Sequence, residues 1–460
     1  MSFLLPLSHI IKQLLPQSST GLTGPPADDA ASLAPKGEGD TGNAFAAIQL
    51  RVPLLLVHGR AGTGKTTLIH RVRESGLRLV VVAPTGIAAL TAGGQTIHSF
   101  FGIPPHIINL EDIETSNRLR SITPHLDLII IDEISMVRAD LLDVVDRTLQ
   151  VNRQNNSPFG GCPIVLMGDF LQLPPITTDD DAAVLQQMGY ESFYAFGAHC
   201  LQRVRPMIIE LSTVYRQTDA KFLDLLGQAR LGQNLEAVVR AFNERCHREH
   251  RQLAKPILLT ATNNSAEGYN RAGLRALPGR SIIYKGCIEE KFKRDRLPAP
   301  EHLELKPQAR IMMVKNDPDG RWVNGSLGTC IRLSEERVWV QLDGSSQKYQ
   351  VDRVTWESIE YRFDQMTQRV RPVTVGTYSQ LPIQPAWAIT VHKSQGLTLE
   401  DVRLDLGVGA FSTGQTYVAL SRARTLEGLS FSRPLRVSDV LVDQNLADGV
   451  RRMVCGTVSL

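Results

Sequence analysis

The sequence lacks long apolar runs, close cysteine pairs and a strong net charge. No apolar stretch reaches the roughly 18 to 20 residues that a membrane-spanning helix needs, so we expect no membrane partner. The six cysteines are far apart and form no C-x-x-C pair, which is typical of free thiols in a reducing compartment. A formal net charge of +3 neither requires nor excludes a nucleic-acid partner, so any basic track must be local.

The first 42 residues differ in composition from the rest of the chain. The apolar start, MSFLLPLSHIIKQLL, lacks the basic start and the small-residue cleavage site of a signal peptide, so we expect a cytoplasmic protein. Residues 17–42 are rich in Ser, Gly, Pro, Ala and Asp, which predicts a flexible tail over residues 1–42. The fold should therefore begin near Asn43.

An apolar run at residues 52–57 leads into VHGRAGTGKTT, and a segment with helical character follows. The complete pattern G-x-x-x-x-G-K-T between a strand and a helix predicts a P-loop, whose backbone N–H groups bind a polyphosphate at a helix N-terminus. Lys65 would reach the β and γ phosphates, and the Thr66 hydroxyl would ligate Mg²⁺. We therefore expect a nucleoside triphosphate to be bound by Gly59, Arg60, Ala61, Gly62, Thr63, Gly64, Lys65, Thr66 and Thr67.

Two later apolar strands end in polar side chains. LDLIIIDEIS, residues 126–135, closes with Asp132 and Glu133, and two carboxylates at the end of a buried strand are costly unless they have a use. Asp132 would bind Mg²⁺, and Glu133 would polarise the attacking water. CPIVLMGDFLQLPPI, residues 162–176, repeats the design with Gln172, whose amide can bond both a γ-phosphate and that water.

Strand-turn-helix units recur along the chain, which predicts an α/β fold with doubly wound parallel sheets. Residues 310–354 change to short alternating strands broken by NDPDG, NGSLG and LDGSS, and this pattern predicts a small β-barrel-like insertion. The α/β pattern resumes at Ala386. A β module therefore interrupts the second of two α/β domains.

Taken in order, the motifs resemble those of superfamily 1B DNA helicases, and more narrowly those of the RecD-like petite-integration-frequency (Pif) family. The motifs, from about residue 52 to residue 432, are GRAGTGKTT, APTGIAA, TIHSFF, IIIDEISMV, GDFLQLPP, VYRQ, TATN, ITVHKSQG and YVALSRA. The resemblance implies two RecA-like motor domains with parallel sheets, and a small SH3-like β insertion in the second. The implied boundaries are 43–209 for the first motor domain, with a wedge insertion at about 103–122, 210–309 and 386–440 for the second, 310–385 for the insertion and 441–460 for a C-terminal tail.

The resemblance also implies an ATP- and Mg²⁺-dependent helicase that moves 5′ to 3′ on single-stranded DNA. Its partners would be single-stranded DNA and forked or 5′-tailed duplexes, in genome maintenance. Arg216 and Arg422 would meet the γ-phosphate from the second domain, completing a catalytic set with Lys65, Asp132, Glu133 and Gln172. The residues similar to the family's contacts with single-stranded DNA are Pro84, Thr85, Gly86, His98, Ser99, Phe100, Thr262, Asn263, His392, Lys393 and Ser394.

Several alternatives stay open from the sequence. A DNA-stimulated translocase that remodels protein–DNA complexes and a nucleotide-gated single-stranded DNA-binding module carry many of the same motifs. Core packing competes with base stacking as the role of Phe100. The glutamine with which the family reads adenine is missing upstream of the P-loop, where Asn43, Gln49 or Gln17 could replace it. We expect a monomer in the absence of DNA, in the cytoplasm beside the nucleoid, with the nucleus or mitochondria as alternatives.

Overall fold

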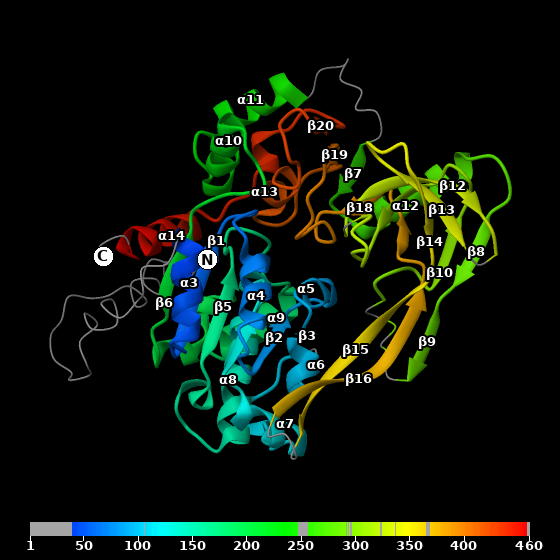
Figure 1. The fold of residues 1–460 in the computed structure, drawn as a ribbon. Helices are drawn as coiled ribbons and strands as arrows, with labels where there is room; N and C mark the ends of the chain where they lie inside the picture. Colours follow the sequence, from blue (N-terminus) through cyan, green and yellow to red (C-terminus); the bar gives the residue numbers. More distant parts are fainter. Residues whose placement is uncertain are drawn as a thin grey trace. The chain divides into compact units, whose positions relative to one another are not determined.

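The computed structural model describes residues 39–457 except 105, 247–255, 291, 293, 295–296, 323, 336 and 365–368 (Figure 1). The chain divides into two compact units. The first comprises Met1–Arg216, Tyr361–Val373 and Val442–Leu460, and the second comprises Gln217–Glu360 and Thr374–Leu441. In the described part of the chain, no helix is both long enough and apolar enough to cross a membrane.

The first unit is built on a parallel sheet with the strand order β3-β2-β4-β5-β1-β6 (Figure 1). Its strands are β1 (Leu54–Gly59), β2 (Leu79–Ala83), β3 (Gln95–Thr96), β4 (Leu128–Ile131), β5 (Ile164–Gly168) and β6 (Met207–Leu211). Its helices are α3 (Gly39–Gln49), α4 (Lys65–Arg73), α5 (Gly86–Thr91), α6 (Ile97–Phe101), α7 (Asn117–Ile122), α8 (Ala139–Arg153), α9 (Asp179–Gln187) and α14 (Gln444–Thr457).

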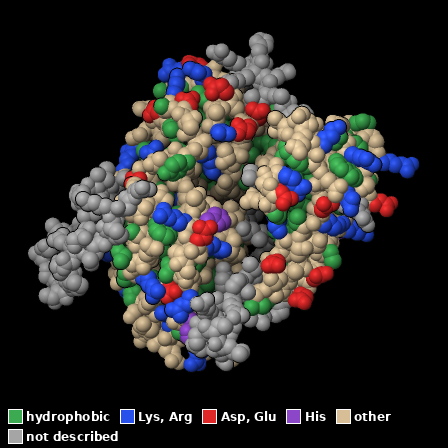
Figure 2. All heavy atoms as spheres, viewed as in Figure 1, with side chains coloured by type: hydrophobic (Ala, Val, Ile, Leu, Met, Phe, Trp, Pro, Cys, Tyr) green, Lys and Arg blue, Asp and Glu red, His purple; other side chains and the backbone are tan. Residues whose placement is uncertain are grey.

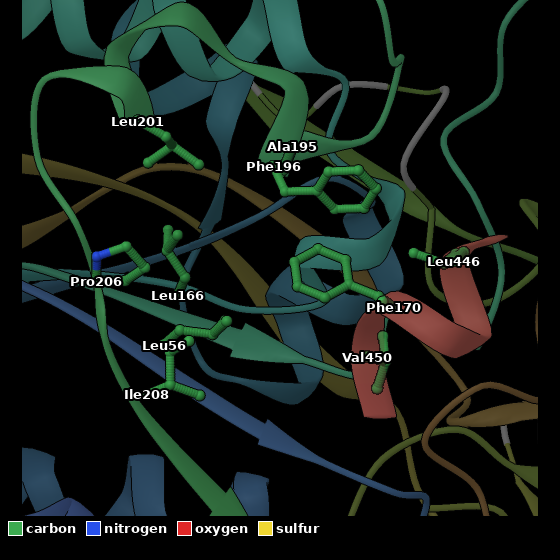
Figure 3. A pocket seen from close by; sticks show the side chains of 11 residues that line it. Leu56, Leu166, Phe170, Ala195, Phe196, Leu201, Pro206, Ile208, Leu446 and Val450 are labelled. Carbon is green, nitrogen blue, oxygen red and sulfur yellow. The ribbon is translucent and has the colours of Figure 1, made fainter. Parts of the chain in front are cut away.

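Alternate residues of the central strand β1 face opposite sides of this sheet. Leu55 and Val57 are buried in a core with Leu68 and Ile69 of α4. Leu56 lies on the other side, where it lines an apolar pocket together with Leu446 and Val450 of α14 (Figure 3). The largely apolar strand therefore buries both of its faces, as expected for a central strand of a parallel sheet.

Both ends of the first unit differ from the boundaries expected from sequence. Helix α3 begins at Gly39, inside the expected tail, and the Asp40 carboxylate accepts a hydrogen bond from Ser212 N at 3.0 Å. The rest of that tail, residues 1–38, lies outside the described residues. The expected C-terminal tail forms helix α14, because Leu446 and Val450 recur at helical spacing and are buried against the sheet.

Two aspartates on successive turns of α8, Asp143 and Asp146, bind the segments that precede β5 and β6. The Asp143 carboxylate accepts hydrogen bonds from Tyr190 Oη at 2.9 Å, His199 N at 2.9 Å and Cys200 N at 2.7 Å. Burial, followed by the Asp143 charge, raises the pKa of Tyr190, so this phenol stays a donor. Asp146 accepts from Phe159 N and forms an ion pair with Arg203. Buried carboxylates therefore help to hold these two segments against α8.

The second unit contains a smaller parallel sheet with the order β18-β7-β19-β20. Its strands are β7 (Ile257–Thr260), β18 (Ala388–Thr390), β19 (Val402–Asp405) and β20 (Leu429–Phe431). Its helices are α10 (Ala220–Leu231), α11 (Leu235–Cys246), α12 (Asn263–Ala276) and α13 (Gln415–Leu420). The expected fold class, with two parallel-sheet domains, is confirmed.

Antiparallel strands interrupt the second parallel sheet between β7 and β18 (Figure 1). One sheet has the order β14-β13-β12-β11-β17, with β11 (Arg310–Met313), β12 (Leu327–Leu333), β13 (Val338–Leu342), β14 (Lys348–Val351) and β17 (Ile383–Pro385). The remaining strands are β8 (Ile282–Lys285), β9 (Cys287–Glu290), β10 (His302–Leu305), β15 (Val354–Asp364) and β16 (Arg369–Gln380). Tyr284 of β8 and Leu303 of β10 share a core with Ile311, so the β module begins earlier than the expected residue 310.

We expect Asp143→Ala to lower the free energy of unfolding by about 3 kcal/mol, because it leaves three buried donors without their acceptor. Tyr190→Phe removes one of those donors and should cost less. Urea denaturation followed by circular dichroism measures both.

Asp180→Ala is the matched control, because Asp180 is exposed on α9. It should change stability by about 0.5 kcal/mol or less. Equal stability of the Asp143 and Asp180 variants would contradict the structural role of Asp143.

Candidate nucleotide and DNA sites

The turn between β1 and α4 has the backbone geometry that the P-loop motif predicts. Gly62 and Gly64 have φ angles of 82° and 86°, a left-handed conformation that favours glycine. Thr63 Oγ1 donates to Arg60 O at 3.0 Å and fastens the turn. Helix α4 starts at Lys65, and Thr66 and Thr67 in its first turn are exposed. The loop thus ends at a helix N-terminus, where an anion is favoured.

The Lys65 ammonium lies over this loop. It donates hydrogen bonds to Gly59 O at 2.6 Å and to Arg60 O at 2.9 Å. Burial lowers the pKa of Lys65, and the charges of Asp169, Glu133 and Asp132 oppose this effect. Lys65, at the start of α4, is therefore close enough to interact with three carboxylates that follow β4 and β5.

The two carboxylates after β4 have different environments. Asp132 is buried, and burial followed by the Glu133 charge raises the pKa of Asp132 to about 7. Its Oδ1 accepts a hydrogen bond from Glu133 N at 2.9 Å. Glu133 has a φ of 51°, which is uncommon for a residue with a side chain and is a form of strain that concentrates at functional sites.

Gln172 is held beside Asp169 at the end of β5. Gln172 N donates to Asp169 O at 2.9 Å, and Gln172 Nε2 donates to Asp169 Oδ2 at 3.4 Å. Asp169 Oδ1 lies 3.9 Å from His58 Nε2, and both residues are fully buried. The sequence predicts the position of Gln172 but gives His58 no role, because a histidine within an apolar run carries little signal.

The segment after β6 crosses the P-loop. Tyr215 N donates to Gly62 O at 2.9 Å, and a Cβ atom at Gly62 would lie 2.5 Å from Arg216 Cβ. Arg216 is part of the first unit, which corrects the expectation that it comes from the second domain. The reason is that β6 pairs with β1, so the residues that follow β6 reach the loop that follows β1.

The second expected arginine, Arg422, is in the second unit but is almost fully buried there. Its guanidinium donates to Val418 O at 2.9 Å, to Ser394 O at 3.3 Å and to Leu397 O at 3.4 Å. In this structure Arg422 therefore fastens α13 to the turn at residues 391–397. The motif alone could not distinguish this role from a phosphate contact.

The expected DNA contacts of the first unit follow β2 and β3. Pro84, Thr85 and Gly86 are partly exposed, and Thr85 Oγ1 accepts from Ala88 N at the start of α5. His98 and Ser99 are also partly exposed. Phe100, however, is fully buried and packs edge-to-face on Phe101 with a centroid distance of 4.8 Å. Its ring therefore has no free face for a base, and the alternative of core packing holds for Phe100.

The expected contacts of the second unit lie at one edge of its sheet. Thr260 and Thr390 are paired at the ends of β7 and β18, so the residues that follow them are neighbours. Thr262, Asn263 and Lys393 are exposed, and His392 is partly exposed. The buried Ser394 donates from Oγ to Val391 O at 2.7 Å, so its hydroxyl supports the turn.

Charges of both signs are mixed over the face of the molecule in Figure 2, in line with the small net charge. Among the described residues, no group of three or more His, Cys, Asp or Glu is arranged to hold a metal ion. A hydroxyl and one carboxylate, Thr66 and Asp132, fit Mg²⁺, which takes few protein ligands when phosphates complete its shell.

A family model described as PIF1-like helicase matches residues 43–238. The ATP-dependent DNA helicase Pif1 of Bdellovibrio bacteriovorus is 32% identical over 383 residues, covering 81% of this chain and 82% of that relative. The chain belongs to the PIF1-like helicase family. The resemblance found in the motifs is thereby confirmed.

Other relatives and structures of the family match over most of this chain. The PIF1 helicase of Mus musculus is 34% identical over 81% of this chain, and the chain spans about half of that relative's length (56%). The crystal structure of Pif1 from Bacteroides sp. in complex with ADP-AlF4 has a TM-score of 0.83 at 32% identity, covering 91% of this chain and 97% of that one. A Bacteroides Pif1 bound to ssDNA has a TM-score of 0.67 at 33% identity, with the same coverage.

Tyr215 is a residue that motif reasoning missed, although it stands next to Arg216 in VYRQ. The residue is 67% exposed, and a Cβ at Gly64 would lie 3.7 Å from its Cε2 atom. This exposed aromatic face beside the P-loop is suited to stacking on a nucleotide base. By contrast, Asn43 and Gln49 on α3, two of the candidates for reading adenine, are both exposed, and the third, Gln17, lies outside the described residues.

We expect Tyr215→Ala to raise the ATP concentration for half-maximal hydrolysis by about 3- to 10-fold, as the loss of one aromatic contact predicts. Tyr215→Phe keeps the ring and should behave like the wild type. Steady-state ATPase measurements test this pair. An unchanged ATP requirement in Tyr215→Ala would show that the ring does not contact the base.

Proposed function

We propose that this chain is an ATP-dependent DNA helicase that moves 5′ to 3′ on single-stranded DNA and unwinds duplexes in genome maintenance. The observation that carries the proposal is the convergence of Lys65, Asp132, Glu133, Asp169 and Arg216 at one edge of the first sheet. Helicase relatives, and a neighbouring structure in complex with ADP-AlF4, support it.

The residues of the first unit can divide the work of ATP hydrolysis. The Lys65 ammonium and the P-loop N–H groups bind and orient the phosphates. Thr66 and Asp132 would hold Mg²⁺, which would neutralise charge at the phosphates. Glu133 accepts the proton of the attacking water, and Gln172 orients that water. Arg216, which lies against Gly62 of the loop, adds a cation that stabilises charge developing on the γ-phosphate.

Single-stranded DNA is the proposed partner of the exposed loops after β2, β3, β7 and β18. Their backbone amides, hydroxyls and Lys393 suit phosphates, which predicts sequence-tolerant binding. Forked or 5′-tailed duplexes are the proposed substrates, and a neighbouring structure of Pif1 at forked dsDNA supports this choice. We further propose that the protein is a monomer in the absence of DNA and that it is located in the cytoplasm beside the nucleoid. The proposed 5′-to-3′ polarity is taken from the resemblance to the family.

Glu133→Gln should lower ATP turnover by at least about 100-fold, because an amide keeps the shape of the side chain but cannot accept the proton. ATP binding, measured with a fluorescent nucleotide, should remain. Glu191→Gln is the control, since Glu191 is exposed in the same unit. Turnover near that of the wild type in Glu133→Gln would remove Glu133 from the catalytic set.

Polarity is tested with matched duplexes that carry a 5′ or a 3′ single-stranded tail, at one salt concentration. We expect ATP-dependent unwinding from the 5′ tail, and little from the 3′ tail or a blunt end. Binding to either tail should weaken as salt rises, because the phosphates hold the strand.

This assay also separates the alternatives. ATP hydrolysis stimulated by DNA without strand separation would favour a translocase that remodels protein–DNA complexes. Nucleotide-dependent binding without turnover would favour a gated binding module. Faster unwinding from the 3′ tail would reverse the direction and leave the nucleotide chemistry unchanged.

A further inference from the structure

Three loops of the second unit leave its parallel sheet at the same edge. Thr260 of β7 is paired with Thr390 of β18 on one side and with Asp405 of β19 on the other. The loop after β18 contains His392, and the loop after β19 contains Phe411. The carboxyl edge of a parallel sheet is the usual place for a ligand.

Phe411 and His392 form a stacked pair across two of these loops. Their ring centroids are 6.2 Å apart, and their planes differ by 13°. Phe411 is 62% exposed, and Val408 in the same loop is fully exposed. Large apolar side chains that are exposed together on a surface are typical of a binding site.

Both loops are anchored, so the pair is held in place before any ligand binds. Phe411 N donates to Oε1 of the buried Gln415 at 3.1 Å. The loop begins at Asp405, whose carboxylate accepts from Gly407 N at 3.0 Å and from Tyr269 Oη at 2.7 Å. Across the pair, Arg422 binds Ser394 O in the turn that carries His392.

At this pair the His392 ring is uncharged, and the positive charge is on the next residue, Lys393. Burial lowers the pKa of His392, so near pH 7 the imidazole is neutral and acts as an aromatic ring. The exposed Lys393 follows it directly. An exposed aromatic face and an exposed lysine next to its ring partner in the chain suit one nucleotide, with the base on the ring and the phosphate at the lysine.

We propose that the Phe411–His392 pair is a base-stacking step for single-stranded DNA, in which one nucleobase stacks on the exposed face of Phe411. Lys393 holds the adjacent phosphate. This assignment rests on the proposed function and adds Phe411, which the motifs do not single out, to the DNA track. It also supplies an aromatic platform that the buried Phe100 cannot provide.

The experiment measures the affinity of the full chain for a fluorescent oligothymidylate and for an abasic oligomer of the same length, by anisotropy at one salt concentration. Phe411→Ala should weaken oligothymidylate binding by about 5- to 150-fold, the range for one stacked base. The abasic oligomer should bind the wild type and Phe411→Ala equally. Such a cycle, with one change on the protein and one on the DNA, isolates the base contact.

Two further variants separate stacking from packing. Phe411→Tyr keeps an aromatic face and should bind like the wild type, whereas Phe411→Leu keeps apolar volume and should lose affinity as Phe411→Ala does. Val184→Ala is the control for an exposed apolar side chain, since Val184 lies on α9 of the first unit. It should leave binding unchanged.

The outcomes distinguish this assignment from the proposed function. If the wild type binds oligothymidylate and either Phe411→Ala or Phe411→Leu binds it equally well, the stacking role is overturned but the proposed function is not. An equal loss on the abasic oligomer also overturns it, because that loss involves no base. A wild type that binds neither oligomer overturns the proposed function and the stacking role together.

Discussion

The parallel alignment of strands determines where the chemistry of this protein can occur. Because neighbouring strands run in the same direction, their carboxyl ends meet at one edge, and residues far apart in sequence are brought together there. In the first unit this edge gathers Lys65, Asp132 and Asp169. In the second unit it gathers the loops that contain Asn263, His392 and Phe411.

The first unit also shows how a charged site is kept within an apolar core. Asp132 and Asp169 are buried at the ends of apolar strands, and hydrogen bonds and the Lys65 charge offset part of the cost of burying them. On α8, the buried Asp143 carboxylate also accepts hydrogen bonds, but from three donors of one loop, and it thereby holds that loop in place. Buried carboxylates thus occur in two roles here, at the proposed nucleotide site and in structural contacts, and the groups that they bind distinguish the two roles.

Sequence reasoning was most successful where a motif and a periodic pattern coincide. The P-loop, the strand before Asp132 and the two α/β domains follow from apolar runs bounded by glycine or by acids, because such runs have one common solution in parallel sheets. The ends of the domains were predicted less accurately from the sequence. Helix α14 was expected to be a tail, since its short apolar stripe gains stability only when a sheet face is available to cover it.

The sequence by itself determined the residue types at the proposed nucleotide site, the family and the order of the sheets along the chain, because these depend on local patterns of residues. Tertiary structure decided which side chains are accessible and which are neighbours. It buried Phe100, exposed Phe411, placed Arg216 against the P-loop and gave Arg422 partners within its own unit. These outcomes depend on strand pairing and on packing between distant segments, which no local pattern of residues specifies.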